Sequence, residues 1–236
     1  MTEPGSGAPT SAGFDAHAER YRQELAQGLM LSGESSDYFL RGRLARTRAL
    51  LRQAAVEPAA IIDFGCGVGT AAEVLRELFP SAQLSGTDIS EASLDAARRQ
   101  HGQLCDFRPP TAMQPASADL VYCNGVFHHI PPLQRTAAMA QIGAALKPGA
   151  HLAFWDNNPW SLAARWVMSR IPFDHDAVMV WPRQARTLIA AAGLQVLRTE
   201  FHFIWPRAMR WLRFSERWVR ALPLAAQYLV WARKPH

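Results

Sequence analysis

Hydrophobic and polar residues alternate along the chain with two different periods. Short apolar runs that end at glycine, proline or polar residues are typical of buried strands, and longer segments with an apolar residue every three or four positions are typical of helices. The predicted strands are residues 59–65, 82–89, 102–107, 119–125, 151–157, 194–205 and 226–234. The predicted helices are residues 14–31, 38–55, 70–79, 91–101, 132–146 and 182–193, and Ser90 is expected to cap the fourth of them.

This repeated alternation predicts an α/β fold, a doubly wound, Rossmann-like, seven-stranded and mainly parallel sheet with helices on both faces. Ligands of such sheets bind beyond the carboxyl ends of the strands. Residues 14–236 are expected to form a single domain after a flexible tail at residues 1–13. We expect the helices within residues 14–57 and an insertion at residues 158–181 to form a lid over the ligand-binding edge.

Composition and charge exclude several classes of protein. No run of about 18 apolar residues is present, so no membrane span is predicted. No secretory signal is visible, and the three cysteines lack CxxC spacing, which together favour free thiols and a cytoplasmic location. The formal net charge of +5 is modest, and because nearly all the basic residues are arginine it gives no reason to expect a nucleic-acid partner.

The segment "IIDFGCGVGT", residues 61–70, ends a predicted strand in three glycines at alternate positions. Glycine allows a tight turn and lets a ligand approach the backbone. Asp63 precedes these glycines, and Asp88 ends the next predicted strand, where a carboxylate can accept two hydrogen bonds from a ribose diol. NAD would suit Asp88, but a carboxylate below a pyrophosphate turn is unfavourable. A cationic nucleoside that carries an amino acid suits both acids better.

Four motifs together resemble the class I S-adenosylmethionine-dependent methyltransferases: "IIDFGCGVGT", "LSGTDIS", "ADLVYCNGVFHHI" and "LKPGAHLAFWDNNP". They are most similar to the branch that includes ubiquinone and menaquinone methyltransferases and many small-molecule methyltransferases. The resemblance runs from about Phe14 to Lys234 and implies S-adenosyl-L-methionine as the cofactor. Fold alone does not separate such an enzyme from a non-catalytic scaffold or partner subunit that binds the same cofactor.

The resemblance also implies a set of cofactor-binding positions. The backbone of the glycine loop is expected to pass the methionine portion, Asp88 to hold the ribose hydroxyls, and Ile89 to pack on the adenine. Asp106, expected to follow the third strand, would take the adenine amino group with Phe107 beside it, although the proline-rich segment there departs from the family pattern. The full predicted set is Asp63, Gly65, Cys66, Gly67, Asp88, Ile89, Asp106, Phe107, Asn124, Gly125 and Val126.

Each of these side chains also has a simpler interpretation. Asp63 could tie the glycine loop to neighbouring amides, and Asp88 could be a helix-capping acid at the surface. Asp106 could be an ordinary loop acid. Cys66 has no basic partner nearby in the sequence, so we interpret it as a small structural residue and not as a nucleophile.

The segment "FHHIPP", residues 127–132, follows the fourth predicted strand, on the side where an acceptor should lie. Histidine is the usual proton acceptor at neutral pH, so His128 and His129 are the candidate catalytic bases. Alternatively, one of them braces the cofactor loop. The predicted acceptor-binding residues are Tyr21, Tyr38, Asn157, Asn158 and Trp160. They favour a small, mostly apolar acceptor such as a secondary metabolite or a quinone-like ring.

No metal site is predicted. Adjacent Asp156 and Asn157 resemble the Asp-Asn pair of metal-dependent catechol-type methyltransferases, but the matching place after the fourth strand carries Asn124 and no carboxylate. A magnesium site needs at least one or two well-placed carboxylates. The histidine and two aspartates at residues 174–176 are interpreted as a polar turn at the rim of the lid.

Residues 206–222, between the last two predicted strands, show the pattern of an amphipathic helix. Arginines fall on one side of the helical wheel and tryptophan, leucine and valine on the other. The simplest expectation is that the apolar side packs on the sheet or on the lid. The alternatives are contact with an anionic membrane surface, with a lipid-like acceptor or with a dimer partner, so the chain is expected to be a monomer or a homodimer.

Overall fold

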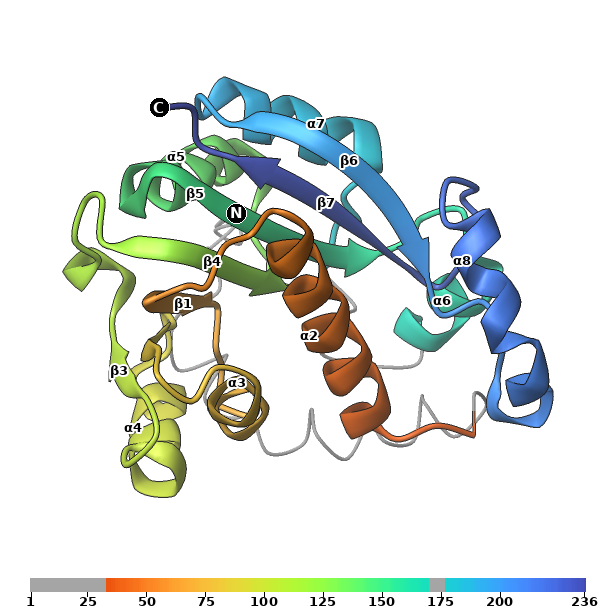
Figure 1. The fold of residues 1–236 in the computed structure, drawn as a ribbon, viewed down its shortest axis with the longest axis horizontal. Coiled ribbons are helices and arrows are strands. Elements are labelled where there is room, and N and C mark those ends of the chain that lie inside the picture. The colour runs from red at the N-terminus through yellow and green to blue at the C-terminus, as the bar shows by residue number, and fades with distance from the viewer. Residues whose placement is uncertain (1–32, 170–176) are drawn as a thin grey trace, which may run out of the picture.

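A seven-stranded sheet forms the centre of the computed structural model, which describes residues 33–169 and 177–236 (Figure 1). The strands are β1 (Ala60–Phe64), β2 (Gln83–Thr87), β3 (Asp106–Arg108), β4 (Ala118–Asn124), β5 (Leu146–Asn157), β6 (Gln195–His202) and β7 (Gln227–Arg233). They lie in the order β3-β2-β1-β4-β5-β7-β6. The first five strands of this order are parallel, and β7 runs antiparallel to both β5 and β6. The predicted Rossmann-like, mainly parallel α/β sheet is confirmed.

Helices cover both faces of the sheet (Figure 1). The α-helices are α2 (Ser36–Gln53), α3 (Ala72–Leu78), α4 (Glu91–His101), α5 (Arg135–Ala145), α6 (Leu162–Met168), α7 (Pro182–Ala191) and α8 (Glu216–Val219). Three segments are 3-10 helices: η2 (Pro110–Ala112), η3 (Pro132–Gln134) and η5 (Arg207–Ser215). The predicted cap of α4 is confirmed, because the Ser93 amide donates to the Ser90 hydroxyl at 3.2 Å.

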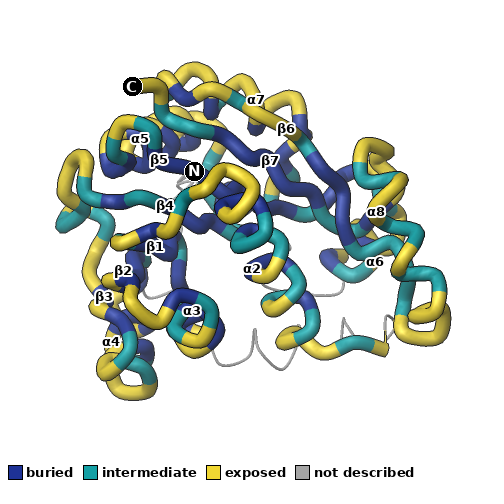
Figure 2. Tube along the Cα trace, in the orientation of Figure 1, coloured by how far each residue is buried: buried dark blue, intermediate teal, exposed yellow. Residues whose placement is uncertain are grey.

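Two hydrophobic cores lie on opposite faces of the sheet. Along β1, Ile61 packs in the core beneath α2, α3 and α4, whereas its neighbour Ile62 packs in the core beneath α5 and α7. Because successive side chains of a strand point to opposite faces, a sheet that is covered on both sides needs apolar residues at nearly every position. Figure 2 shows the central strands buried and the outer surfaces of the helices exposed. The open edge at the carboxyl ends of the strands is therefore where polar side chains can gather.

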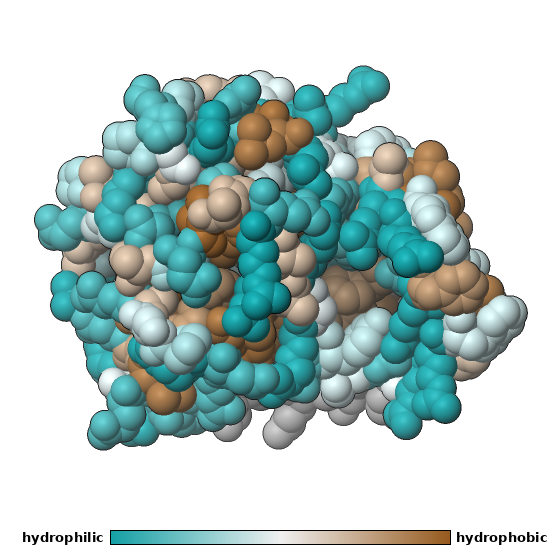
Figure 3. Space-filling model, viewed as in Figure 1, coloured by the Kyte–Doolittle hydropathy of each residue, from teal (hydrophilic) through white to brown (hydrophobic). Residues whose placement is uncertain are grey.

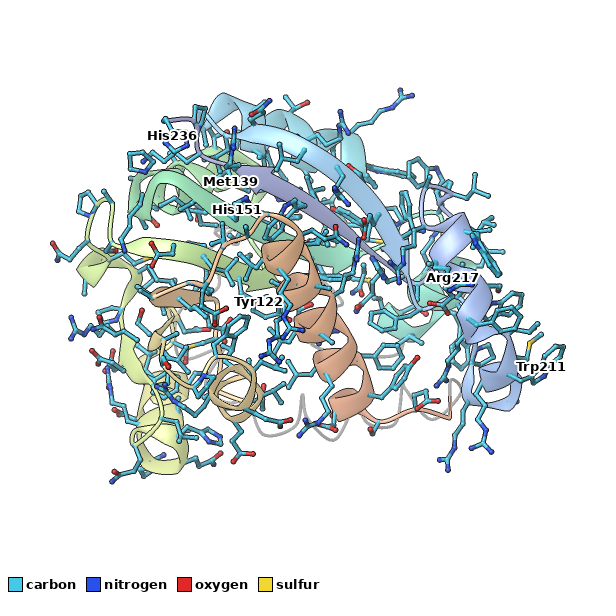
Figure 4. All side chains as sticks on the ribbon, in the orientation of Figure 1. Tyr122, Met139, His151, Trp211, Arg217 and His236 are labelled. Carbon is cyan, nitrogen blue, oxygen red and sulfur yellow. The ribbon has the colours of Figure 1, made fainter. Side chains whose placement is uncertain are left out.

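Helix α2 is fixed to the sheet by polar contacts as well as by apolar packing. Arg43 donates from Nε to the Tyr122 hydroxyl at 3.2 Å, and Trp155 donates from Nε1 to the Thr47 hydroxyl at 3.3 Å. Figure 4 shows Tyr122 beside α2. Arg46 forms a bidentate ion pair with Glu200 at 2.8 and 2.6 Å. Much of the predicted lid at residues 14–57 is thus a layer of the fold, and residues 14–32 lie outside the described residues.

The Glu200 carboxylate is charged at all ordinary pH values. Burial alone would raise its pKa, but hydrogen bonds from His202 and Arg46 hold the pKa well below its usual value. A buried carboxylate with two such partners is stabilised as an ion, so α2 and β6 are joined by a permanent charge pair.

Two predicted elements are wrong in position or type. The strand expected at residues 102–107 is β3, which covers only Asp106–Arg108. The segment expected to form one amphipathic α-helix at residues 206–222 is the 3-10 helix η5, with a distorted backbone at Met209, followed by the four-residue α8. The insertion at residues 158–181 contributes α6, and its aspartates and histidine at 174–176 lie outside the described residues. None of the helices that the structure describes has the length and apolar character needed to cross a bilayer.

Candidate functional site at the carboxyl edge of the sheet

The glycine loop turns sharply where β1 ends. The amides of Gly65 and Cys66 both donate to the Thr87 carbonyl at the end of β2, at 2.7 and 2.9 Å. Gly65 and Gly67 have positive φ values of 74° and 53°, which glycine adopts without strain. A Cβ on Gly65 would clash with a methyl carbon of Val126, whereas a Cβ on Gly67 would meet nothing within 4 Å. The loop is therefore packed on one side and open beside Gly67, where a ligand can approach the backbone.

Asp88 lies directly after β2 and holds the glycine loop in place. Its Oδ2 accepts the Gly67 amide at 2.9 Å, and its Oδ1 accepts the Ser90 amide at 2.9 Å. Asp88 thus has a structural role, but that role differs from the simpler interpretation, because Ser90 caps α4 and Asp88 ties the glycine loop. Each carboxylate oxygen has a second lone pair, so the group can still accept hydrogen bonds from a diol. The neighbouring Ile89 is 65% exposed and offers an apolar surface at the same edge.

Asp63 lies in β1 beneath the loop and is buried. Burial and the charge of Asp88 raise its pKa to about 7, and the guanidinium of Arg43 partly opposes this shift. Within residues 33–169 and 177–236 its carboxyl accepts no hydrogen bond, so the loop amide is held by Asp88 and not by Asp63. Asp63 is a titratable group near neutral pH, and a bound cation would favour its ionised form.

Replacing Asp63 with asparagine is expected to stabilise the protein above neutral pH. An aspartate with a pKa near 3.8 in the unfolded chain and about 7 in the fold binds more protons when folded, so its contribution to stability falls between these pH values. The free energy of unfolding that Asp63→Asn gains should therefore be larger at about pH 8 than at about pH 5, by roughly 2 kcal/mol. Urea unfolding at both pH values measures this difference. An equal gain for Asp63→Asn at both pH values would contradict the burial argument.

His128 forms a buried pair with Asp156. Its Nδ1 lies 2.6 Å from Asp156 Oδ1, and the two side chains are 3% and 1% exposed. The loop after β4 positions the histidine, and the end of β5 positions the aspartate. A Cβ on Gly125 would lie 3.7 Å from His128 Cε1, so the edge of the ring faces the loop after β4. A carboxylate on one ring nitrogen fixes the orientation and tautomer of a histidine, and it stabilises the protonated ring.

His129 lies beside His128, with ring centroids 4.2 Å apart and the ring planes tilted by 52°. Burial and the neighbouring His128 lower the pKa of His129 to about 2. A side chain that resists protonation this strongly is a weak proton acceptor at neutral pH. Of the two predicted bases, the geometry favours His128.

The structure places Asp106 and Phe107 away from the expected adenine position. Asp106 is the first residue of β3, pairs in register with Ser85 inside β2, and forms an exposed ion pair with Arg108. It therefore does not follow the strand. Phe107 is buried beneath the glycine loop, where its ring would lie 2.9 Å from a Cβ on Gly69. Both residues belong to the fold and not to the open edge.

The predicted acceptor residues divide into two groups. Asn157 and Trp160 are partly exposed near the end of β5, and Trp160 contacts Trp181 with ring centroids 5.3 Å apart. Asn158 is fully buried, and its amide nitrogen donates to the Pro223 and Ala225 carbonyls at 3.1 and 2.7 Å. Asn158 is thus a structural residue, which corrects its predicted role.

Tyr38, also predicted to bind the acceptor, lies in the first turn of α2. It packs against Phe203 with ring centroids 5.9 Å apart and lies below the guanidinium of Arg213. Tyr21 lies outside the described residues. Figure 3 shows the surface hollowed between α2 and α8, with hydrophobic residues inside the hollow.

Three hydrogen-bonded polar side chains cross this edge, and the sequence did not suggest this connection. Arg43 donates from Nη1 to Gln227 Oε1 at 3.0 Å, and Gln227 donates from Nε2 to Asn157 Oδ1 at 3.2 Å. The signal that could have revealed it is the antiparallel register, which sets Gln227 opposite Asn157. These two hydrogen bonds link the buried Arg43 of α2 to Asn157 at the end of β5, and they fix the side-chain amide of Asn157.

The cysteines and the Asp156-Asn157 pair provide no other reactive centre. The three cysteines are free and buried, and burial raises the pKa of the Cys66 thiol well above its usual value. A thiol that stays protonated is a poor nucleophile. No group of three metal-ligating side chains occurs among the described residues.

The part of the chain that forms this edge is similar to known methyltransferases. A family model described as "Methyltransferase domain" matches residues 62–152, which contain the glycine loop, Asp88 and the two histidines. A trans-aconitate 2-methyltransferase of Variovorax paradoxus is 38% identical over 101 residues, 41% of this chain and 38% of its own length. A ubiquinone biosynthesis O-methyltransferase of Idiomarina loihiensis is 30% identical over 129 residues, 51% of this chain and 50% of its own length. The chain thus spans at most half the length of these two curated relatives.

Solved structures show the same fold. The crystal structure of a SAM-dependent methyltransferase from Archaeoglobus fulgidus superposes with a TM-score of 0.60 at 16% identity, over 80% of this chain and 94% of that one. At such low identity the likeness concerns the arrangement of the sheet and helices.

Proposed function

We propose that the chain is a class I S-adenosylmethionine-dependent methyltransferase, which transfers the methyl group of S-adenosylmethionine to a small-molecule acceptor. The observation that carries the proposal is the junction of β1 and β2, where an open glycine loop, a buried acid and a partly exposed acid meet at one edge. Few other ligands need a close backbone approach, a cation-favouring carboxylate and a diol-binding carboxylate together.

The described residues fit this cofactor. The open space beside Gly67 admits the methionine portion, and the exposed side chain of Ile89 offers a surface for the adenine. Asp88 would accept hydrogen bonds from the ribose diol while it keeps those from the Gly67 and Ser90 amides. Ionised Asp63 favours the positive charges of the ligand. The bound cofactor supplies an electrophilic methyl group, and the chain supplies alignment and the removal of a proton.

His128 is the proposed base. Methyl transfer to a hydroxyl or to a carbon acid needs a deprotonated acceptor, and His128 would take that proton on its Nε2 while Asp156 stabilises the resulting charge on the ring. Asp156 is a positioning residue, because it acts on the acceptor only through His128. An acceptor with an already deprotonated nucleophile would need only the alignment.

The proposed acceptor is a small molecule with an apolar body and a polar handle. Trp160 would form one wall, and the Asn157 amide, fixed by Gln227, would meet the polar group. The names of two relatives, a trans-aconitate methyltransferase and a ubiquinone biosynthesis methyltransferase, support a small acceptor. The atom that receives the methyl group depends on the acceptor.

The cofactor assignment predicts that S-adenosylhomocysteine binds with a dissociation constant in the micromolar range, about −8 kcal/mol in binding free energy, and that NAD does not bind measurably. NAD is disfavoured because its pyrophosphate would lie against the negative potential of Asp63. Titration calorimetry with both ligands tests this directly. Tighter binding of NAD than of S-adenosylhomocysteine would overturn the assignment.

A further inference from the structure

The connection between β6 and β7 carries a surface that the proposed methyl transfer does not use. It contains six exposed large hydrophobic side chains within sixteen residues. These are Met209 at 38%, Trp211 at 70%, Phe214 at 60%, Trp218 at 64%, Leu222 at 49% and Leu224 at 63% exposure. We call residues 206–224 the aromatic-basic surface. The expectation that its apolar side packs on the sheet or on the lid is wrong for these residues, since their side chains face outward.

Positive charge is interleaved with these apolar side chains. The segment holds five arginines and a single acid, Glu216. Arg207, Arg210 and Arg217 are exposed, and the Arg217 guanidinium lies 4.3 Å from the centre of the Trp218 ring. Figure 3 shows hydrophilic and hydrophobic residues intermixed over this side of the molecule, and Figure 4 shows Trp211 directed away from its body.

The segment is held in shape by its own hydrogen bonds. Glu216 accepts the amides of Ile204 and Trp205 at 3.0 and 3.1 Å, so the acid is turned inward to the backbone. Trp205 donates from its indole nitrogen to Ser215 at 3.0 Å. The exposed side chains therefore stand on an ordered support, and the acid does not offset the arginines at the outer face.

We propose that the aromatic-basic surface docks on an anionic membrane surface. Tryptophan and phenylalanine insert at the level of lipid headgroups, and arginines beside them attract acidic lipids, so the combination matches a bilayer in both chemistry and charge. A protein partner would need a complementary acidic and apolar face, and a second copy of this chain would set arginines against arginines. The surface also lies at the carboxyl edge of the sheet, because β6 ends at His202 opposite Gln227, which pairs with Asn157.

The test is co-sedimentation of the full chain with two kinds of vesicle, phosphatidylcholine alone and phosphatidylcholine mixed with phosphatidylglycerol. The chain is expected to bind the mixed vesicles and to leave the neutral ones largely unbound, with affinity falling as salt is added. Each arginine near an anionic surface contributes about fivefold to partitioning. The double variant Arg210→Glu/Arg217→Glu should therefore lose about 30-fold or more in binding.

A matched control separates local docking from net charge. Arg52 and Arg183 are exposed on α2 and α7, so the double variant Arg52→Glu/Arg183→Glu makes the same change in charge elsewhere and should lose less than about threefold. Trp211→Ser should weaken binding strongly, whereas Leu133→Ser, at a residue that is 97% exposed in η3, should not. These readouts use lipid alone and are independent of the proposed methyl transfer.

Three results would overturn the proposal. The first is equal binding to neutral and mixed vesicles, and the second is equal loss in the two arginine double variants. The third is absence of vesicle binding by the full chain. In that last case a concentration-dependent dimer that Trp211→Ser dissociates would identify a second copy as the occupant.

Discussion

Replacing Asp88 with alanine is expected to weaken S-adenosylhomocysteine binding by at least about 100-fold. The variant removes the acceptor of two charge-assisted hydrogen bonds from the ribose diol, each worth roughly 1.5–3 kcal/mol. It also releases the Gly67 amide that Asp88 holds at 2.9 Å, so the loop loses part of its preorganised shape. Titration calorimetry of the variant and the parent chain measures the change.

The structural role of Asp88 requires a second measurement. Loss of the Ser90 amide contact at the start of α4 should cost about 1 kcal/mol of stability, so thermal unfolding must be followed alongside binding. Asp88→Asn keeps one acceptor oxygen and should bind with intermediate affinity. Asp95→Ala removes a neighbouring acid on α4 and should bind normally. A folded Asp88→Ala chain that binds S-adenosylhomocysteine as tightly as the parent would refute the role of Asp88 in the cofactor site.

The turn of the glycine loop could be predicted because its signals are local. An apolar run, an acid and alternating glycines define a strand end and a tight turn within ten residues, and the positive φ values of Gly65 and Gly67 agree with that turn. Asp88 could be found because β2 follows one helix later and lies beside β1 in a parallel sheet. What the sequence could not show is that Asp88 itself fastens the loop, since that contact joins residues 21 positions apart.

Asp106 and Asn158 were misplaced because their roles depend on register. β3 is a three-residue strand at the edge of the sheet, which is too short for its apolar pattern to fix where it ends. The pleat then buries Phe107 and exposes Asp106. Asn158 directly follows polar residues, so the sequence suggests that it is exposed. In the structure the segment before β7 covers it, and its side-chain amide donates to carbonyls 65 and 67 positions away.

The segment after β6 shows the limit of periodicity arguments. A wheel at 100° per residue assumes an α-helix, whereas η5 is a 3-10 helix with three residues per turn, so side chains predicted for one face are spread around it. Arg213 is drawn inward to Glu34, and the neighbouring Trp211 is left exposed. The arginines and apolar residues of the segment could be recognised from the sequence, but which of them are exposed depends on the tertiary contacts.

The pairing of His128 with Asp156 also had to be seen in three dimensions. The two residues are 28 positions apart, and the sequence offered one as a base and the other as part of a possible metal site. The parallel pairing of β4 with β5 brings the ends of both strands to the same edge, and the loop after β4 turns the histidine toward the aspartate. In this geometry Asp156 can orient His128, which is a role that requires no bound metal. The geometry also predicts how the two residues should respond to substitution.

His128→Ala is expected to lower methyl transfer by about 10²–10⁴-fold while S-adenosylhomocysteine affinity changes little. The acceptor is first identified as the component of a metabolite extract that takes label from methyl-labelled S-adenosylmethionine, and turnover is then followed as a function of pH. His129→Ala should have a much smaller effect, because burial keeps that side chain from accepting protons near neutrality.

Asp156→Asn provides the readout that separates positioning of a base from simple bracing of the loop. Without the carboxylate 2.6 Å from Nδ1, the protonated ring is less stabilised, so the acidic limb of the turnover profile should move to lower pH and the maximum should fall. A pair that only braces the loop would change thermal stability and leave the shape of the profile as it is. If His128→Ala and Asp156→Asn both keep near-normal turnover from about pH 6 to about pH 9, no histidine acts as the base, and the enzyme works by alignment alone on a nucleophile such as a thiol or a weakly basic amine.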